Sequence, residues 1–189
     1  ARIEAALGDL FAGTFDGIAK DSTYASVCAG VAQAREAQAD LLIAVGGGSV
    51  IVATRAISIF LSEQGDPFDL MTQYPEGGRP ISPRLMAPKV PIINIPTTPT
   101  SAMNRAGTGL KNPDLDHRME YFDPKTRPQA IFIDDGALMT APAGLIQSTA
   151  TTVFAWAVGA MSLTDINPLV EGDHIQALRL ALRGYRGLP

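Results

Sequence analysis

The sequence predicts an α/β protein in which a Rossmann-like parallel sheet is followed by the start of an all-helical domain. Short continuous apolar runs at residues 41–45, 90–95 and 129–133 have the length and composition of buried parallel strands. Helical periodicity flanks the first of these runs, and only helical patterns occur towards the C-terminus. We therefore expect an α/β domain at residues 1–141 and the beginning of a helical domain at residues 142–189.

Composition excludes several classes of protein. Hydrophobic residues make up 46% of the 189 residues and charged residues 18%, which is typical of a chain that forms a globular core. The net charge of −4 and the absence of a basic cluster argue against a nucleic-acid partner. The apolar runs are too short to span a membrane, and no export signal opens the chain, so we expect a cytoplasmic location. Cys28 has no second cysteine to pair with, and we interpret it as a buried spectator thiol.

The first strand lies between two predicted helices. Residues 21–23, Asp-Ser-Thr, offer an N-cap for a helix that reaches Ala39, and the strand at 41–45 follows directly. Gly46-Gly47-Gly48-Ser49 ends this strand, and a second apolar-faced helix runs from Val50 to about Leu61. The order is therefore helix, strand, glycine loop and helix.

The glycine loop has the chemistry of an anion site. Three glycines let the backbone approach an anion closely, and the following helix presents free N–H groups and a positive dipole end. No lysine follows Ser49, so the loop is not a Walker A motif, and it also lacks the GxGxxG spacing. The loop predicts a nucleotide pyrophosphate, and a purely structural tight turn is the alternative.

A second polar segment should lie beside the glycine loop. The strand at 90–95 runs into the hydroxyl-rich segment 96–101, and ligands of parallel sheets bind outside the carboxyl ends of the strands. Residues 63–89 are rich in Pro and Gly and predict a surface loop, whereas residues 104–128 read as polar and irregular. After the strand at 129–133, adjacent aspartates are interpreted as turn and cap residues.

Three of these motifs occur in an order that resembles the iron-containing alcohol dehydrogenase family, including its dehydroquinate-synthase-like and maleylacetate-reductase-like relatives. They are Ala44–Ile51 around the glycine loop, Ile95-Pro96-Thr97-Thr98, and Ile133-Asp134 followed by Leu138 and Pro142. The resemblance covers nearly the whole chain, but members of the family are roughly twice as long. A fragment, a proteolysed chain and a naturally short relative all remain open.

The resemblance implies a bound NAD or NADP. It assigns the pyrophosphate to Gly46, Gly47, Gly48 and Ser49, and hydroxyl contacts on the nicotinamide side to Thr97 and Thr98. Ser101 and Arg118 complete the expected cofactor-binding set, with Arg118 standing in place of a family lysine. For the two threonines, a simple turn-capping role is the alternative.

The chain departs from the family at several functional positions. Val52 and Arg55 replace an Asp and a Lys on the helix behind the glycine loop, and Asn104 replaces a Glu. Thr152 and Trp156 stand where the family places an Asp and a His that bind the metal, so we expect this chain to bind neither iron nor zinc.

Other candidate side chains receive structural interpretations. We expect Trp156 to pack at the helical interface rather than to recognise a substrate. His117 and His174 have no partner at ligand spacing, and we expect both to face solvent.

The resulting functional hypothesis is NAD(P)-dependent interconversion of a small alcohol and its aldehyde or ketone. No catalytic residue is identified, although Arg118 could stabilise a developing alkoxide. A catalytically degenerate nucleotide-binding or scaffolding homologue is the alternative, and a lyase resembling dehydroquinate synthase is a third and weaker one. The expected partner is a small alcohol or carbonyl substrate. An exposed apolar helical region would need either a second copy in a homodimer or the remainder of a longer chain.

Overall fold

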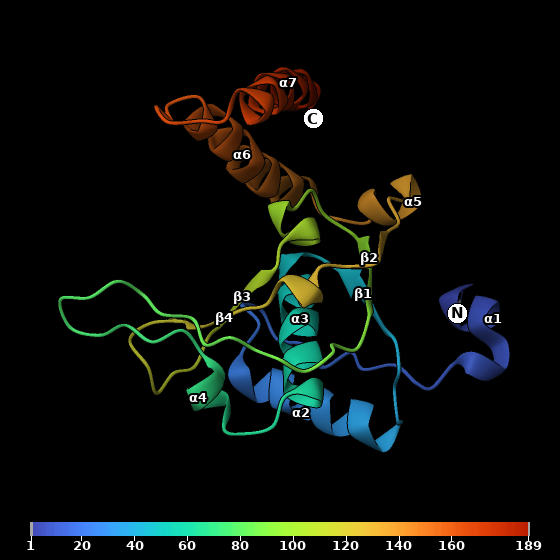
Figure 1. Ribbon diagram of the computed structural model, residues 1–189. Coiled ribbons are helices and arrows are strands. Elements are labelled where there is room, and N and C mark those ends of the chain that lie inside the picture. Colours follow the sequence, from blue (N-terminus) through green and yellow to red (C-terminus); the bar gives the residue numbers. More distant parts are fainter. Residues whose placement is uncertain (1, 189) are drawn as a thin grey trace.

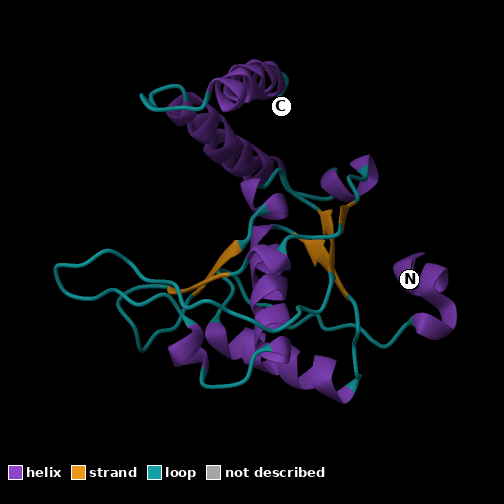
Figure 2. Ribbon diagram, viewed as in Figure 1, coloured by secondary structure: helices purple, strands orange, loops and turns teal. Residues whose placement is uncertain are grey.

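The computed structural model describes residues 2–188. A small parallel sheet and an antiparallel hairpin pack beside one central helix, and two long C-terminal helices project from this body (Figures 1 and 2). The sheet contains β1 (Leu42–Gly46), β2 (Ile92–Pro96) and β5 (Ala130–Ile131) in the order β1-β2-β5. All its pairings are parallel, and Leu42 lies opposite Ile92. This arrangement is a Rossmann-like α/β fold, as the sequence predicts.

The central helix is α3 (Gly48–Ser62), and nine of its fifteen residues are buried. The sheet packs on one side of α3, while α2 (Tyr24–Glu36) and the hairpin of β3 (Gly107–Leu110) and β4 (Met119–Phe122) pack on the other (Figure 1). A helix that is apolar around most of its circumference is stable only when it is enclosed in this way. The sequence run Ile-Ser-Ile-Phe-Leu near its end is therefore a core segment.

The main core lies between α3, α2 and the hairpin rather than in the sheet. Phe60 of α3 meets Tyr24 of α2 and Tyr121 of β4 edge to face, with ring centroids 6.3 and 5.2 Å apart. Burial raises the pKa of Tyr121, whose hydroxyl donates to the carbonyl of Pro67, 3.1 Å away. The hairpin contributes Leu110, Met119 and Tyr121, which alternate with exposed or half-buried residues as period-two strands require.

Shorter elements connect these parts. The chain begins with α1 (Arg2–Leu7) and the single turn η1 (Gly8–Leu10), both without buried residues. One-turn helices occur at α4 (Pro67–Leu70), η2 (Ser101–Asn104), η3 (Pro124–Thr126) and α5 (Asp135–Leu138).

The C-terminal helices α6 (Ala143–Ala160) and α7 (Pro168–Arg186) pack on each other and project from the α/β body (Figure 1). Neither helix contains a buried residue, although α6 is strongly apolar in composition. No helix within residues 2–188 is both long and apolar enough to cross a membrane.

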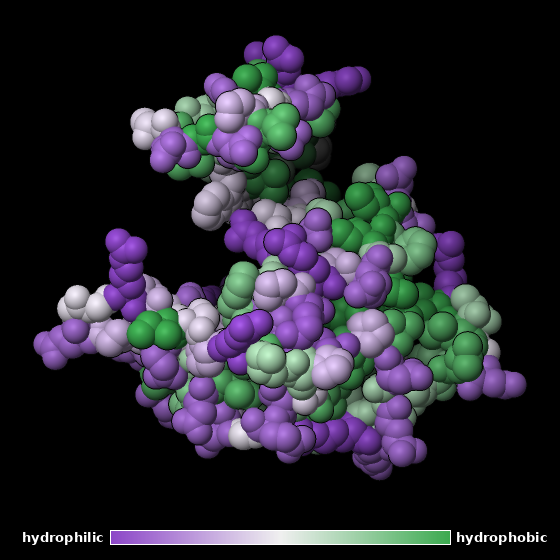
Figure 3. All heavy atoms as spheres, in the orientation of Figure 1, coloured by the Kyte–Doolittle hydropathy of each residue, from purple (hydrophilic) through white to green (hydrophobic). Residues whose placement is uncertain are grey.

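The outer face of the sheet is also apolar and accessible. Val45 near the end of β1 is 45% exposed, and Phe132 directly after β5 is 57% exposed. Figure 3 shows hydrophobic residues gathered over the sheet and the segment around α5. The first strand is therefore half-buried, not enclosed on both faces as its apolar sequence predicts.

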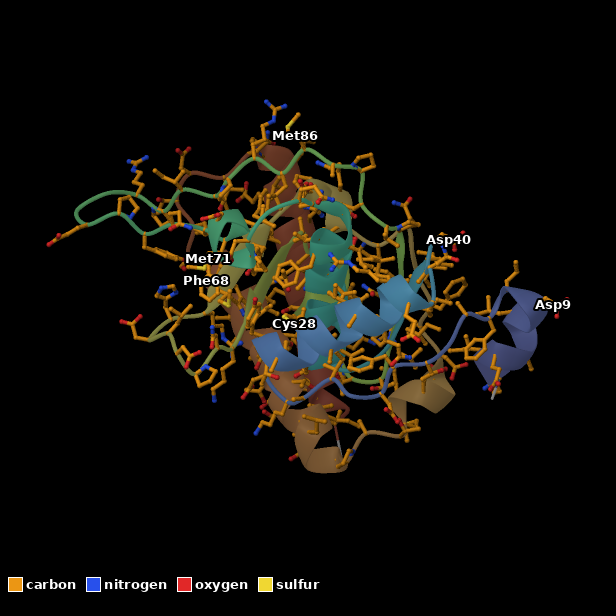
Figure 4. The ribbon with its side chains drawn as sticks, turned by 90° about the horizontal axis from the view of Figure 1, so that it is seen from below. Asp9, Cys28, Asp40, Phe68, Met71 and Met86 are labelled. Carbon is orange, nitrogen blue, oxygen red and sulfur yellow. The ribbon has the colours of Figure 1, made fainter. Side chains whose placement is uncertain are left out.

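Three further expectations are corrected by the structure. Residues 104–128 contain the β3–β4 hairpin and supply part of the core, so they are not irregular. The segment 63–89 is not a pure surface loop, because Met71 and Leu85 are buried in the same core. Cys28 is half-buried on α2, near the α4 segment that carries Phe68 (Figure 4), so its thiol is not fully enclosed.

The expected N-cap of α2 is confirmed at Thr23. Thr23 caps the helix by accepting a hydrogen bond from the amide of Ser26, but Asp21 and Ser22 lie before it in a left-handed backbone conformation. The adjacent aspartates behave as expected, since Asp134 caps α5 through the amide of Ala137 at 2.7 Å.

A buried ion-pair network fastens the end of α3 to the hairpin. Lys89 Nζ lies 2.5 Å from Glu63 Oε1 and 2.9 Å from Asp123 Oδ2, and Lys125 Nζ lies 3.0 Å from the same Asp123 oxygen. The Lys89 and Asp123 side chains are 1% and 2% exposed. Burial alone would raise the pKa of Asp123, but the Lys125 amide and the two ammonium groups outweigh it and hold that pKa below the ordinary value.

The substitution Asp123→Asn should therefore destabilise the fold by about 3 kcal/mol at pH 7, because it removes the buried carboxylate that two ammonium groups share and leaves Lys89 paired with Glu63 alone. A lowered pKa means that the wild-type network stabilises fully above about pH 4 and is lost as pH falls through the folded pKa. Urea unfolding should show that the free energy of unfolding falls less between pH 7 and pH 3 in the variant than in the wild type. Asp116→Asn is the matched control, since that side chain is 96% exposed, and an equal cost in both variants would contradict the network's role.

Candidate functional site

The glycine loop forms an unusually tight passage from β1 into α3. The strand ends at Gly46, Gly47 occupies the N-cap, and the helix already begins at Gly48. A Cβ atom on Gly46 would lie only 2.6 Å from Cγ2 of Val50, so this position requires glycine for close approach. The Gly46 carbonyl accepts a hydrogen bond from the Thr97 amide at 3.0 Å, which joins the ends of β1 and β2.

The hydroxyl-rich segment after β2 lies directly against the glycine loop, as the parallel sheet predicts. A Cβ atom added to Gly47 would lie 3.3 Å from Thr98 Oγ1, and one added to Gly48 would lie 3.4 Å from Thr100 Oγ1. Thr98 is buried, and its hydroxyl has no hydrogen-bond partner among the described residues. A buried hydroxyl without a partner is costly, so Thr98 points to a polar group that binds beside the loop.

An open pocket of about 690 Å³ extends from the N-terminus of α3 along the face of the helix towards the hairpin. Gly48 and Ser49 line its start, Val52 and Arg55 continue the same helix face, and Arg118 lies across from them at the base of β4. Helix N-termini attract anions because their first N–H groups are unpaired and the helix dipole is positive there. The volume is within the range of small-molecule and cofactor sites.

Asp21 and Ser22 form the edge of this pocket, whereas their sequence predicts only a helix cap. Their φ angles are 67° and 53°, a conformation that residues other than glycine adopt rarely. Ser22 Oγ donates to the Ser49 carbonyl at 2.7 Å, and the Asp21 amide donates to Ser49 Oγ at 3.2 Å. Backbone strain of this kind is concentrated at functional sites, but no sequence pattern signals it here.

The predicted cofactor-binding residues fall into three groups. Gly48, Ser49 and Arg118 line the pocket. A second group, consisting of Gly46, Gly47, Thr97 and Thr98, forms the layer behind the loop. Ser101 is separate, because its carbonyl and hydroxyl accept hydrogen bonds from Arg105 at 3.1 and 3.2 Å.

Arg118 is held by the pocket's rim. Its Nη1 donates to the carbonyls of Asp21 and Gly109, both at 3.3 Å, and its Nη2 lies 4.0 Å from the Asp21 carboxylate. The side chain is half-exposed, so the ion pair with Asp21 contributes little to stability. Arg118 is therefore positioned to meet a polar ligand in the pocket.

Arg55 is the least expected residue of the site. It is 1% exposed, its Nη1 donates to the Ala102 carbonyl at 2.6 Å, and its Nε has no partner among the described residues. Desolvation, together with the nearby charge of Arg105, lowers the pKa of Arg55 to about 10, so the group stays protonated at neutral pH.

Thr152 and Trp156, which the sequence resemblance predicts at metal-ligand positions, lie one helical turn apart on α6, but their side chains do not suit a metal. Thr152 Oγ1 donates to the Ser148 carbonyl at 3.1 Å, and the indole of Trp156 offers only an N–H donor. No group of three potential ligand side chains gathers anywhere in the described part of the chain. The residues present therefore do not fit the metal that the family name implies.

Two side-chain expectations about this region are wrong. Trp156 is 61% exposed instead of packed in a helical interface, and its ring lies 5.2 Å from the guanidinium of Arg105. His174 is half-buried, and its Nδ1 is enclosed without a hydrogen-bond partner in the described residues. His117 is exposed as expected, with Nδ1 2.9 Å from the Arg118 carbonyl.

Comparison with known proteins gives a consistent set of relatives. The family model described as iron-containing alcohol dehydrogenase matches residues 1–135. A 4-hydroxybutyrate dehydrogenase of Cupriavidus necator is 29% identical over 92% of this chain and 44% of its own length. The lactaldehyde reductase of Escherichia coli K12 is 28% identical, with the same shares covered. The chain thus spans less than half the length of the curated relatives it matches.

Solved structures support the fold. An alcohol dehydrogenase from Oenococcus oeni superposes with a TM-score of 0.82 at 22% identity, covering 97% of this chain and 47% of its own. A sulfoacetaldehyde reductase from Bifidobacterium kashiwanohense, solved in complex with NAD+, gives 0.79 at 21% identity and covers 95% and 46%. Maleylacetate reductase from Rhizobium is a further neighbour, with a TM-score of 0.75 at 22% identity over 98% and 45%.

The tight turn at Gly46 can be tested by adding one methyl group. We expect Gly46→Ala to lower the free energy of unfolding by about 1–3 kcal/mol, because Val50 must move and the start of α3 with it. Gly144→Ala in the exposed first turn of α6 is the control, since a Cβ there meets no atom within 4 Å and alanine favours helix. Chemical denaturation of both variants gives the measurement, and a neutral Gly46→Ala would contradict the geometry of the turn.

Proposed function

Because the chain belongs to the iron-containing alcohol dehydrogenase family, we propose that it binds NAD or NADP and takes part in hydride transfer between the nicotinamide and a small alcohol or carbonyl compound. The observation that carries the proposal is the juxtaposition of the glycine turn, the unpartnered hydroxyl of Thr98 and the pocket along α3. Each of these features is explained by a polar, anionic ligand at the loop.

Each part of the pocket has a role in this proposal. The amides at Gly48 and Ser49 and the dipole of α3 would hold the pyrophosphate, with Thr98 as a further hydroxyl partner behind the loop. Arg118 would donate to cofactor or substrate oxygens from the hairpin side. When bound, the nicotinamide supplies the hydride chemistry, and this chain's residues bind and orient it.

No step of the proposed reaction is assigned to a metal. The hydroxyl of Thr152 is already engaged by its own helix, and Trp156 has no lone pair to offer a cation. The chain's contribution is therefore argued from its hydrogen-bond donors and positive charges alone.

A nucleotide-binding or scaffolding homologue without turnover is the second candidate function. The replacement of family ligands by Thr152 and Trp156, and of an acid by Asn104, favours it. Nucleotide binding without oxidation or reduction of any compound in a panel of alcohols, aldehydes and keto acids would distinguish this function from the first.

We further propose a domain boundary near residue 142 and a cofactor site confined to the α/β part. Pro142 precedes α6, and no residue of α6 or α7 is buried against the body. The candidate pocket, by contrast, is lined by residues between 21 and 122.

Calorimetric titration with NADH and NADPH, with and without Fe²⁺ or Zn²⁺, tests the proposed function directly. We expect at least one nucleotide to bind and the metal to leave its affinity unchanged, because the binding groups are backbone amides, hydroxyls and arginines. If neither nucleotide bound under any condition, the cofactor assignment would be wrong.

Thr98→Val separates a ligand role from a structural role. We expect nucleotide affinity to fall by up to about tenfold, while the free energy of unfolding stays the same or rises, because a buried hydroxyl without a partner is removed. Thr126→Val is the matched control: its buried hydroxyl donates to the carbonyls of Asp123 and Ala106, so stability should fall by about 1–3 kcal/mol with no change in affinity. A loss of stability in Thr98→Val would count against the ligand role.

A further inference from the structure

The far end of the pocket carries positive charge that no carboxylate neutralises. Arg55 lies seven positions after Gly48 on α3, which corresponds to about 10 Å along the helix axis. Arg55 lies in the pocket floor, almost fully buried, with Nε unpartnered. No carboxylate lies within ion-pair distance of Arg55 or Arg105 among residues 2–188.

Arg105 adds a second, accessible cation at the same place. The two arginines bond to neighbouring carbonyls of one 3₁₀ turn, Arg55 to Ala102 and Arg105 to Ser101. Both line the pocket, and the charge of Arg105 contributes to lowering the pKa of Arg55. Placing like charges together costs energy, and an anion bound between them recovers it.

The carboxylates that do line the pocket are engaged elsewhere. Asp21 faces Arg118, and Glu120 accepts a short hydrogen bond from the Tyr74 hydroxyl. Asp21 lies just before α2 and Glu120 lies on β4, and neither forms an ion pair with Arg55 or Arg105.

We propose that Arg105, above the buried Arg55, forms an anion subsite that binds a carboxylate of the substrate. This inference rests on the proposed function, since it takes the N-terminus of α3 as the pyrophosphate end of the pocket. The arginine pair then lies at the opposite end. Arg105 also contacts Trp156 of α6, so the subsite faces the helical part of the chain. A guanidinium with free N–H groups binds a carboxylate through charge-assisted hydrogen bonds.

The substrate class that fits is a small hydroxy acid or its oxo acid. Arg105 is exposed and fixed by two hydrogen bonds to Ser101, so its remaining N–H groups are available at low entropic cost. The exposed indole of Trp156 beside it offers an apolar surface for the short carbon chain of such a molecule.

Calorimetry on the NADH-saturated chain tests the subsite with ω-hydroxy carboxylates of three to five carbons and α,ω-diols of the same lengths. NADH prevents turnover of these alcohols, so binding alone is measured. We expect the acids to bind at least tenfold more tightly than the diols. Arg105→Ala should abolish that preference, and Arg105→Lys should restore part of it, because lysine keeps the charge but not the planar fork.

Arg127→Ala is the matched control. It removes one exposed arginine that bonds the Asn104 carbonyl but does not line the pocket. Equal binding of acids and diols by the wild type, or equal effects of Arg105→Ala and Arg127→Ala, would overturn the subsite. If Arg105→Ala weakened NADPH but not the acids, the anion would be the cofactor's 2′-phosphate and the carboxylate assignment would be wrong.

The same titrations without nucleotide separate this inference from the proposed function. If NADH failed to bind while acids still bound in an Arg105-dependent way, the cofactor assignment would be lost and the anion subsite kept. If NADH bound but the acids bound no more tightly than the diols, the anion subsite would be lost and the cofactor assignment kept.

Discussion

The position of α3 is the constraint on which the rest of the structure depends. The helix is enclosed by the sheet on one side and by α2 and the hairpin on the other, and it begins immediately after a strand. That entry is possible only because Gly46 brings the backbone within contact of Val50. The helix that fills the core is therefore also the helix whose N-terminus opens the pocket, so packing and ligand geometry cannot vary independently.

The parts of the site that could be predicted are those with local signals. A short apolar run, three glycines and a helical period occur next to each other, and parallel pairing then forces the end of β2 to the same rim. Even here the sequence placed the start of the helix two residues late. Glycine is a poor helix former by itself, so the sequence does not indicate that Gly48 already belongs to α3.

The features that were missed depend on contacts between distant residues. The β3–β4 hairpin contains Gly107 and Gly109, which weaken any strand signal, and its pairing becomes favourable only when Leu110 and Met119 reach the core beside α3. Lys89 and Asp123 look like surface charges in the sequence, yet they form a buried pair. Trp156 shows the opposite error, because an aromatic side chain that suggested packing lies exposed beside Arg105.

The presence of an arginine rather than a lysine at position 55 also fixes how the pocket responds to acidity. A lysine subjected to a similar desolvation would start from a pKa of about 10.4 and fall to roughly 8, where it begins to lose its proton in mildly alkaline solution. The guanidinium, with a pKa of about 10 at this buried position, stays charged throughout the neutral range. The positive charge of Arg55 beneath the pocket is thus constant over the pH of most cells. The attraction between Arg55 and an incoming acid therefore changes with the protonation of the acid and not with that of Arg55.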